Sequence, residues 1–143
     1  MPDDAIAVPK GAPTPDAPQG ASWLCASADL EEAGKARVFD VMLWRRPARA
    51  FALRFEGRVV AYMNRCAHVP TEMDWQPGEF LDADRRFILC ATHGAVYEPT
   101  TGHCIAGPCA GARLMAIAVV ERAGQVYWYP SSDIGPVVFE EPT

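Results

Sequence analysis

Two short cysteine–histidine pairs are the residues of this chain best suited to chemistry. They are Cys66-Ala-His68 and Cys90-Ala-Thr-His93, and 21 residues lie between His68 and Cys90. Two thiolates and two imidazoles complete a four-ligand metal set, and both ligand types suit zinc and iron–sulfur chemistry. The set therefore fits either a structural zinc site or a [2Fe–2S] centre in which two Cys hold one iron and two His hold the other.

The order of the ligands and the elements around them bear on this choice. The common zinc-finger order keeps the two Cys together and the two His together on a helix. Here each pair is mixed, and each follows a strand-like segment. Loops at strand ends let ligands converge without breaking the hydrogen bonds of a sheet. The spacing alone is compatible with both a zinc site and an iron–sulfur centre.

Composition limits the class of protein. The chain has 143 residues, is half apolar and carries a net charge of −5, which indicates one domain with tails. The acidic balance argues against nucleic acid as a partner and is compatible with docking onto a basic protein. No basic and apolar leader is visible, and the longest apolar run, Leu114 to Val120, is too short to span a membrane. We therefore expect a cytoplasmic protein whose five cysteines are metal ligands or free thiols.

The spacing of strand patterns predicts an all-β sandwich or barrel. Residues 1–21 are expected to form a flexible Pro-rich tail, 22–129 the domain, and 130–143 a C-terminal extension. One helical turn or a loop is expected over 29–36. The expected strands cover 38–44, 50–56, 59–64, 86–89, 95–98, 114–121 and 125–129.

The residues after Cys90 resemble a known family. Cys90-Ala-Thr-His93-Gly94 is followed by the aromatic Tyr97 and then by Thr101-Gly-His-Cys-Ile-Ala-Gly107-Pro108. This C-x-x-H-G and T-G-x-C-x-x-G-P pattern resembles the second half of a Rieske iron–sulfur domain, and Cys66-Ala-His68 resembles its first half. The resemblance covers roughly residues 22–129.

The resemblance implies a fold and a ligand set. The fold is a Rieske-like antiparallel β-sandwich or barrel, with a small cluster-binding subdomain of two hairpin loops over about residues 64–110. Cys66 and Cys90 would bind the inner iron of one [2Fe–2S] cluster, and His68 and His93 the outer iron through Nδ1. Gly94, Tyr97 and the Gly107-Pro108 loop would surround the cluster.

The resemblance also implies a function. A Rieske protein of this size would be a one-electron carrier between a reductase and a terminal oxidoreductase such as an oxygenase, and not an enzyme itself. The chain is too short to hold the mononuclear iron domain of an oxygenase. The alternatives are a redox-sensing or regulatory subunit and a zinc-stabilised binding module without a redox role.

Three departures from the high-potential members of the family matter. Thr71 and Thr92 stand where those members carry a disulfide, and Ala95 stands where they carry a serine that donates to a cluster sulfur. A lost donor leaves the reduced cluster less stabilised, so the potential falls. We expect a midpoint potential on the order of −150 mV or somewhat higher.

Several other residues are expected to be structural. In the long 69–89 segment, Trp75 and Phe80 are predicted to pack on the domain; a partner-binding surface or a lid is the alternative. Large aromatics in strands are usually core, so Trp44 and Trp128 are also predicted to be buried. Cys25, Cys104 and Cys109 are predicted to be free thiols, and Cys25 is also predicted to be buried.

Overall fold

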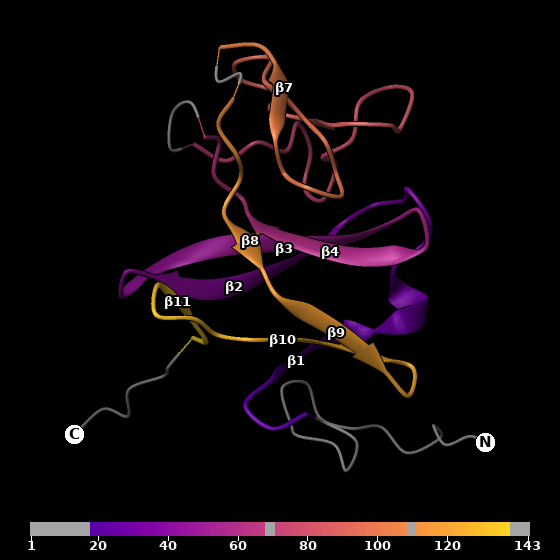
Figure 1. The fold of residues 1–143 in the computed structure, drawn as a ribbon, viewed down its shortest axis with the longest axis vertical. Coiled ribbons are helices and arrows are strands. Elements are labelled where there is room, and N and C mark those ends of the chain that lie inside the picture. The colour runs from indigo at the N-terminus through magenta and orange to yellow at the C-terminus, as the bar shows by residue number, and fades with distance from the viewer. Residues whose placement is uncertain (1–17, 68–70, 109–110, 138–143) are drawn as a thin grey trace.

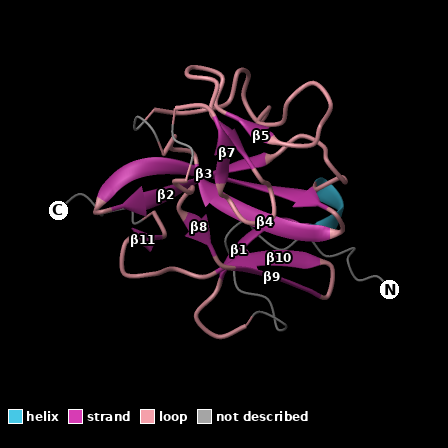
Figure 2. Ribbon diagram, turned by 45° about the horizontal axis from the view of Figure 1, so that its top comes forward, coloured by secondary structure: helices cyan, strands magenta, loops and turns pink. Residues whose placement is uncertain are grey.

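Short antiparallel strands make up nearly all of the regular structure. The computed structural model describes residues 18–67, 71–108 and 111–137. Within these ranges it contains no α-helix, only a 3₁₀ turn at Ser27–Asp29 (Figure 2), so the all-β prediction is confirmed. The strands are β1 (Ser22–Ala26), β2 (Arg37–Leu43), β3 (Arg46–Phe55), β4 (Arg58–Met63), β5 (Ile88–Leu89), β6 (Val96–Tyr97), β7 (Cys104–Ala106), β8 (Ala116–Ile117), β9 (Val119–Arg122), β10 (Gln125–Trp128) and β11 (Ile134–Gly135).

The strands form three antiparallel sheets. The central sheet has the order β11-β2-β3-β4-β8, and a second sheet has the order β1-β10-β9. The third sheet, β5-β6-β7, belongs to a small subdomain on the far side of the central sheet from β1-β10-β9 (Figure 1). No helix among the residues that the structure describes is long and apolar enough to cross a membrane.

Strand β3 explains why the layers stack on both sides of the central sheet. Phe51 and Leu53 point into one core and Ala50 and Ala52 into the other, as the two-residue period of a strand requires. The large side chains pack towards the small subdomain, and the alanines allow the β1-β10-β9 sheet to approach closely. The sequence pattern predicted a half-buried strand here, and residues 50–53 are in fact buried on both faces.

One stacked aromatic pair joins the small subdomain to the central sheet. The rings of Phe51 and Phe80 lie with their centroids 3.7 Å apart and their planes at 13°. Phe80 is buried, as predicted for the 69–89 segment. The same prediction is wrong for Trp75, whose side chain is 52% exposed.

Three two-residue turns close the hairpins of the larger sheets. Each has positive φ at both positions, which matches the right-handed twist of paired strands. Two of the turns, Glu56-Gly57 and Ala123-Gly124, place glycine second, where the left-handed region carries no steric cost. The third turn, Trp44-Arg45, has no glycine and holds both residues at positive φ (51° and 67°). Trp44 therefore lies at a hairpin tip with 53% exposure, and the prediction that it belongs to the core is wrong.

The structure also differs from the prediction of one strand over 114–121. This run of residues divides into β8, which pairs with β4, and β9, which pairs with β10. Ala118 lies between them, and its carbonyl accepts a hydrogen bond from the Tyr129 N–H (2.9 Å). The run thus crosses from one sheet to the other.

Candidate metal centre

The first candidate ligand loop begins where β4 ends. The Met63 N–H donates to the Met115 carbonyl, and the chain then turns into the buried Cys66, which is 2% exposed. The Cys66 N–H donates to the Thr71 carbonyl across the loop (3.0 Å). This bond holds the backbone of the loop at Cys66. His68 lies outside the described residues.

The second ligand loop is the turn between β5 and β6. The Cys90 N–H donates to the Ala95 carbonyl and the Gly94 N–H donates to the Cys90 carbonyl, both at 2.8 Å. Gly94 has φ of +75°, a conformation that glycine adopts without steric cost. The tight turn holds Cys90 and His93 on one side of the loop.

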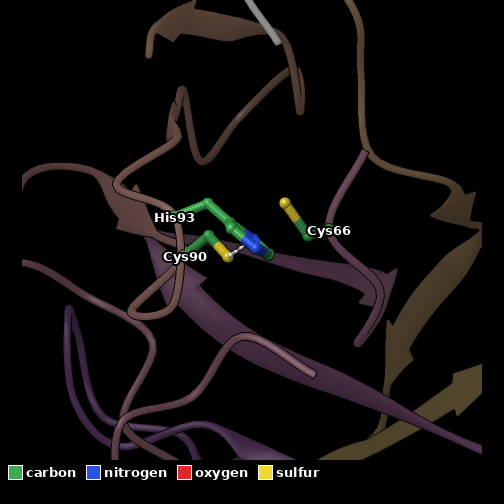
Figure 3. A group of neighbouring side chains, drawn as sticks. All are labelled: Cys66, Cys90 and His93. Atoms are coloured by element: carbon green, nitrogen blue, oxygen red, sulfur yellow. Dashed lines mark hydrogen bonds between the residues drawn. The ribbon is translucent and has the colours of Figure 1, made fainter. Parts of the chain in front are cut away.

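The two loops converge on one small space. Cys66 Sγ, Cys90 Sγ and a ring nitrogen of His93 all lie within 4.8 Å of one another. Cys90 Sγ is 4.0 Å from His93 Nδ1. Figure 3 shows Cys90 and His93 on one loop and Cys66 facing them from the other. Three of the four predicted ligands are therefore brought together by chain segments distant in sequence.

The electrostatics of this group favour a bound cation. Burial raises the pKa of the Cys90 thiol, backbone N–H donation around His93 lowers it, and the nearby Cys66 raises it. Two buried thiols side by side cannot both ionise readily without a positive charge between them. A metal supplies that charge, and thiolate and imidazole donors match both iron–sulfur and zinc chemistry. The residues present fit a [2Fe–2S] cluster.

Tyr97 connects the two loops through its hydroxyl group. Its oxygen accepts a hydrogen bond from the Ala67 N–H (2.9 Å) and lies 3.4 Å from Cys66 Sγ. Tyr97 comes from β6 and is fully buried. The hydroxyl can thus donate its proton towards the Cys66 sulfur.

Gly107 lies against the second ligand loop. It has φ of +96°, and a Cβ added to it would come within 2.9 Å of both the Ala95 Cα and the Gly94 carbonyl oxygen. A side chain here would push the two backbones apart. Pro108 follows and is exposed, while Ala95 itself is fully buried. The Gly107-Pro108 segment therefore covers one side of the ligand loop.

The site also depends on Asn64, which the sequence analysis did not single out. Its side chain is 6% exposed; the amide Nδ2 donates to Asp74 Oδ1 (3.0 Å), and Oδ1 accepts from the Met73 N–H (2.7 Å). Met73 in turn accepts a hydrogen bond at its carbonyl from the Ala91 N–H, next to Cys90. Asn64 thereby ties the segment after residue 70 to both ligand loops.

The two remaining cysteines among the described residues are both buried. Cys25 is fully buried, as predicted, and is a free thiol. Cys104 is 4% exposed, and its thiol donates to the Ala106 carbonyl oxygen (3.3 Å). Cys109 lies outside the described residues. His103 is exposed, and its Nε2 lies 2.6 Å from Arg113 Nη2.

Comparison with known proteins identifies the family. The Rieske [2Fe-2S] domain matches residues 21–127, so the chain belongs to that family, whose cofactor is a [2Fe–2S] cluster. The prediction from the residues after Cys90 is thereby confirmed. A search of curated proteins found no significant match.

Solved structures show the same fold. The ferredoxin of carbazole 1,9a-dioxygenase from Nocardioides aromaticivorans IC177 is 21% identical, with a TM-score of 0.62 over 79% of this chain and 100% of that one. The reduced complex between oxygenase and ferredoxin in carbazole 1,9a-dioxygenase contains a chain that is 18% identical, with a TM-score of 0.60 over 75% of this chain and 27% of that one. The terminal oxygenase from Novosphingobium sp. KA1 is 22% identical, with a TM-score of 0.58 over 85% of this chain and 31% of that one.

Proposed function

We propose that this protein is a one-electron carrier that serves a terminal oxidoreductase and is not itself a catalyst. The observation that carries the proposal is the convergence of the buried Cys66 and Cys90 with the half-buried His93 in a chain of the Rieske family. Two kinds of ligand on one small centre are typical of a Rieske cluster. Among the described residues, no other group of three or more His, Cys, Asp or Glu side chains could hold a separate mononuclear iron.

The ligand assignment is part of this proposal. Cys66 and Cys90 would hold one iron, and His68 and His93 would hold the other. When bound, the cluster supplies a one-electron couple whose potential depends on its ligands and on hydrogen bonds to its sulfurs. Cys66 and Cys90 are buried and exclude water from the inner side, whereas His93 is partly exposed. His93 therefore marks the side on which an electron leaves.

The partners follow from the structures that share the fold. One of them is a ferredoxin of a dioxygenase, and another is a complex between oxygenase and ferredoxin. We propose a terminal oxygenase as the electron acceptor, a reductase as the donor, and the cytoplasm as the location.

The test is the visible and EPR spectrum of the purified protein after reduction by dithionite, with iron, zinc and acid-labile sulfide measured on the same sample. We expect about two irons and two sulfides per chain and the signal of mixed Cys/His ligation. The variants Cys66→Ser and His93→Ala should lose this signal. Cys104→Ser is the matched control, because it changes a buried cysteine outside the ligand set. A colourless protein that holds zinc and no sulfide would contradict the proposal.

A further inference from the structure

We propose that a groove running from Cys66 to Trp44 is a docking surface for an acidic segment of a partner protein. The inference rests on the proposed function only in that the partner is a redox protein. The surface is defined by three adjoining hollows, by a fixed exposed tryptophan and by arginines that have no carboxylate partner among the described residues. We call it the Trp44 groove.

The three hollows share residues at each junction. The first, about 270 Å³, is lined by Cys66, Arg65 and Arg113. The second, about 340 Å³, shares Arg113 with the first and is also lined by Asp133. The third, about 710 Å³, shares Asp133 with the second and ends at Trp44. A continuous depression therefore leads from a candidate cluster ligand to the tip of the β2–β3 hairpin. Strand β11 pairs with β2 beside this tip (Figures 1 and 2).

Trp44 is exposed but held in place. Its backbone N–H donates to the Asp133 carbonyl (2.9 Å), and its indole Nε1 donates to Asp133 Oδ1 (3.2 Å). The guanidinium carbon of Arg65 lies 5.0 Å from the centre of its ring. A large aromatic whose conformation is already fixed loses little entropy on binding, which is the property of an interface anchor. Arg65 is adjacent in sequence to Cys66, so the anchor is linked directly to the ligand loop.

The backbone beneath this anchor is strained. Trp44 and Arg45 both have positive φ, whereas the two other hairpin turns place glycine second. L-residues are disfavoured in the left-handed region, and such strain gathers at functional positions. The turn therefore keeps a tryptophan and an arginine exposed at a position where glycine would relieve the backbone.

The charge of the groove indicates which charge its partner carries. In the part of the chain that the structure describes, no carboxylate lies at ion-pair distance from Arg45, Arg65 or Arg113. By contrast, Arg49 and Arg54 each hold a bidentate carboxylate. Asp133 is the one acidic residue on the three hollows within the described ranges. The groove is therefore locally positive.

The net charge of −5 does not oppose this conclusion. Five acidic residues fall in the terminal ranges outside the described residues, where the sequence places Asp3, Asp4, Asp16, Glu140 and Glu141. The described ranges hold 12 basic and 13 acidic residues and are nearly neutral. A positive groove on a nearly neutral domain complements a negative segment of a partner. A concave surface with its arginines inside suits a protein segment better than a flat lipid surface.

The test measures binding of a fluorescein-labelled peptide, six glutamates with a central leucine, to the oxidised full-length protein at low salt by fluorescence anisotropy. We expect saturable binding, and no binding of the matching lysine peptide. Trp44→Ala and Arg65→Gln should each weaken binding of the glutamate peptide at least threefold. Trp75→Ala and Arg58→Gln are the matched controls and should leave this binding unchanged. Trp75 is as exposed as Trp44 (52% against 53%), and neither Trp75 nor Arg58 lines the groove.

A gain of binding separates this proposal from mere loss of structure. Asp133→Asn keeps a side-chain acceptor for the Trp44 indole and removes the negative charge from the groove, so it should tighten peptide binding at least twofold. An unchanged visible spectrum and melting temperature show that each variant is folded.

Three results would overturn the proposal. The first is equal binding of the glutamate and lysine peptides, and the second is that the groove variants and the control variants bind the glutamate peptide with equal affinity. The third is that the groove variants still bind the glutamate peptide and lose only binding to phosphatidylserine vesicles, measured in parallel. Each is independent of the proposed function, because peptide binding is measured without electron transfer. A protein that lacks the cluster signal but binds the peptide would contradict the function and not the groove.

Discussion

The hydroxyl of Tyr97 is the side-chain group of the site whose role is most directly measurable. It lies 3.4 Å from Cys66 Sγ and accepts from the Ala67 N–H. A hydrogen bond to a ligand sulfur stabilises the more negative, reduced state. We expect Tyr97→Phe to lower the midpoint potential by about 40 mV, because about 1 kcal/mol of lost hydrogen bonding corresponds to that shift in a one-electron couple. Protein-film voltammetry provides the measurement.

Tyr62→Phe is the matched control for this change. Tyr62 is also a buried tyrosine of the same core, but its hydroxyl donates to the Pro99 carbonyl (2.7 Å) and not towards a sulfur. This variant should lose stability while its midpoint potential stays within about 10 mV of the wild-type value. Such a shift is small beside the roughly 59 mV that corresponds to a tenfold change in the equilibrium constant of a one-electron couple. Equal shifts in both variants would show that the potential reports general loosening of the core.

Cys25 gives a prediction for alkaline pH. Burial in the core raises the pKa of its thiol from 9.0 to about 11. Between these values the unfolded chain loses the proton and the folded chain keeps it, so the free energy of unfolding falls as the pH rises from about 9 to about 11. Urea unfolding at a series of pH values should show this fall, and Cys25→Ala should flatten it. Parallel curves for the two proteins would contradict the assignment to Cys25.

Among the elements, the segment from residue 71 to Phe80 has several contacts, and two of them, a buried one at Asn64 and an exposed one at Glu72, can be compared by mutation. The buried contact is that of Asn64 with the Met73 N–H and with Asp74, which also accepts from the Gly78 N–H (3.1 Å). Asn64→Ala leaves the Met73 N–H without its acceptor. We expect a loss of about 1–3 kcal/mol of stability and faster amide hydrogen exchange at Met73 and Gly78.

Glu72→Gln is the comparison for this element. It breaks the bidentate ion pair with Arg49, which is exposed and therefore contributes little. Exchange at Met73 should stay close to that of the wild type. If Glu72→Gln opens the segment as much as Asn64→Ala does, the exposed ion pair holds the segment as firmly as Asn64 does, and the prediction is wrong.

The sequence predicted the elements whose signal is local. The hairpin of β3 and β4 follows from the alternating apolar residues of 50–56 and from the turn at Glu56-Gly57, and three of the four predicted ligands lie close together. The exposure of Trp44 did not follow, because the pattern over Val38 to Trp44 is continuous and the strand ends in a turn without glycine. The Asn64 contact did not follow either, since its partners lie 9 and 10 residues away across a ligand loop.

At the scale of the molecule, the central sheet sits between two cores. One lies under the ligand loops and the other under the β1-β10-β9 sheet, and β3 contributes to both. We propose residues 22–129 as the Rieske domain, with the subdomain over about 64–110 on one side. Strand β11 comes from the following extension and pairs with β2 (Ile134 with Leu43), which makes this part of the extension an edge of the sheet.

The contribution of β11 to the whole fold can be tested at Ile134. Its side chain is 4% exposed and belongs to the core beneath the β1-β10-β9 sheet. Replacing it by alanine removes buried surface and leaves a cavity, so we expect Ile134→Ala to lower the free energy of unfolding by about 2–5 kcal/mol. Ile105→Ala is the matched control; Ile105 is 47% exposed, and its loss should stay within about 0.5 kcal/mol. Equal losses of stability for Ile134→Ala and Ile105→Ala in urea unfolding would mean that the extension lies on the domain without stabilising it. A much larger loss for Ile134→Ala would mean that Ile134–Gly135 is a structural strand, and this strand would then also hold the neighbouring Asp133 in its contacts with Trp44.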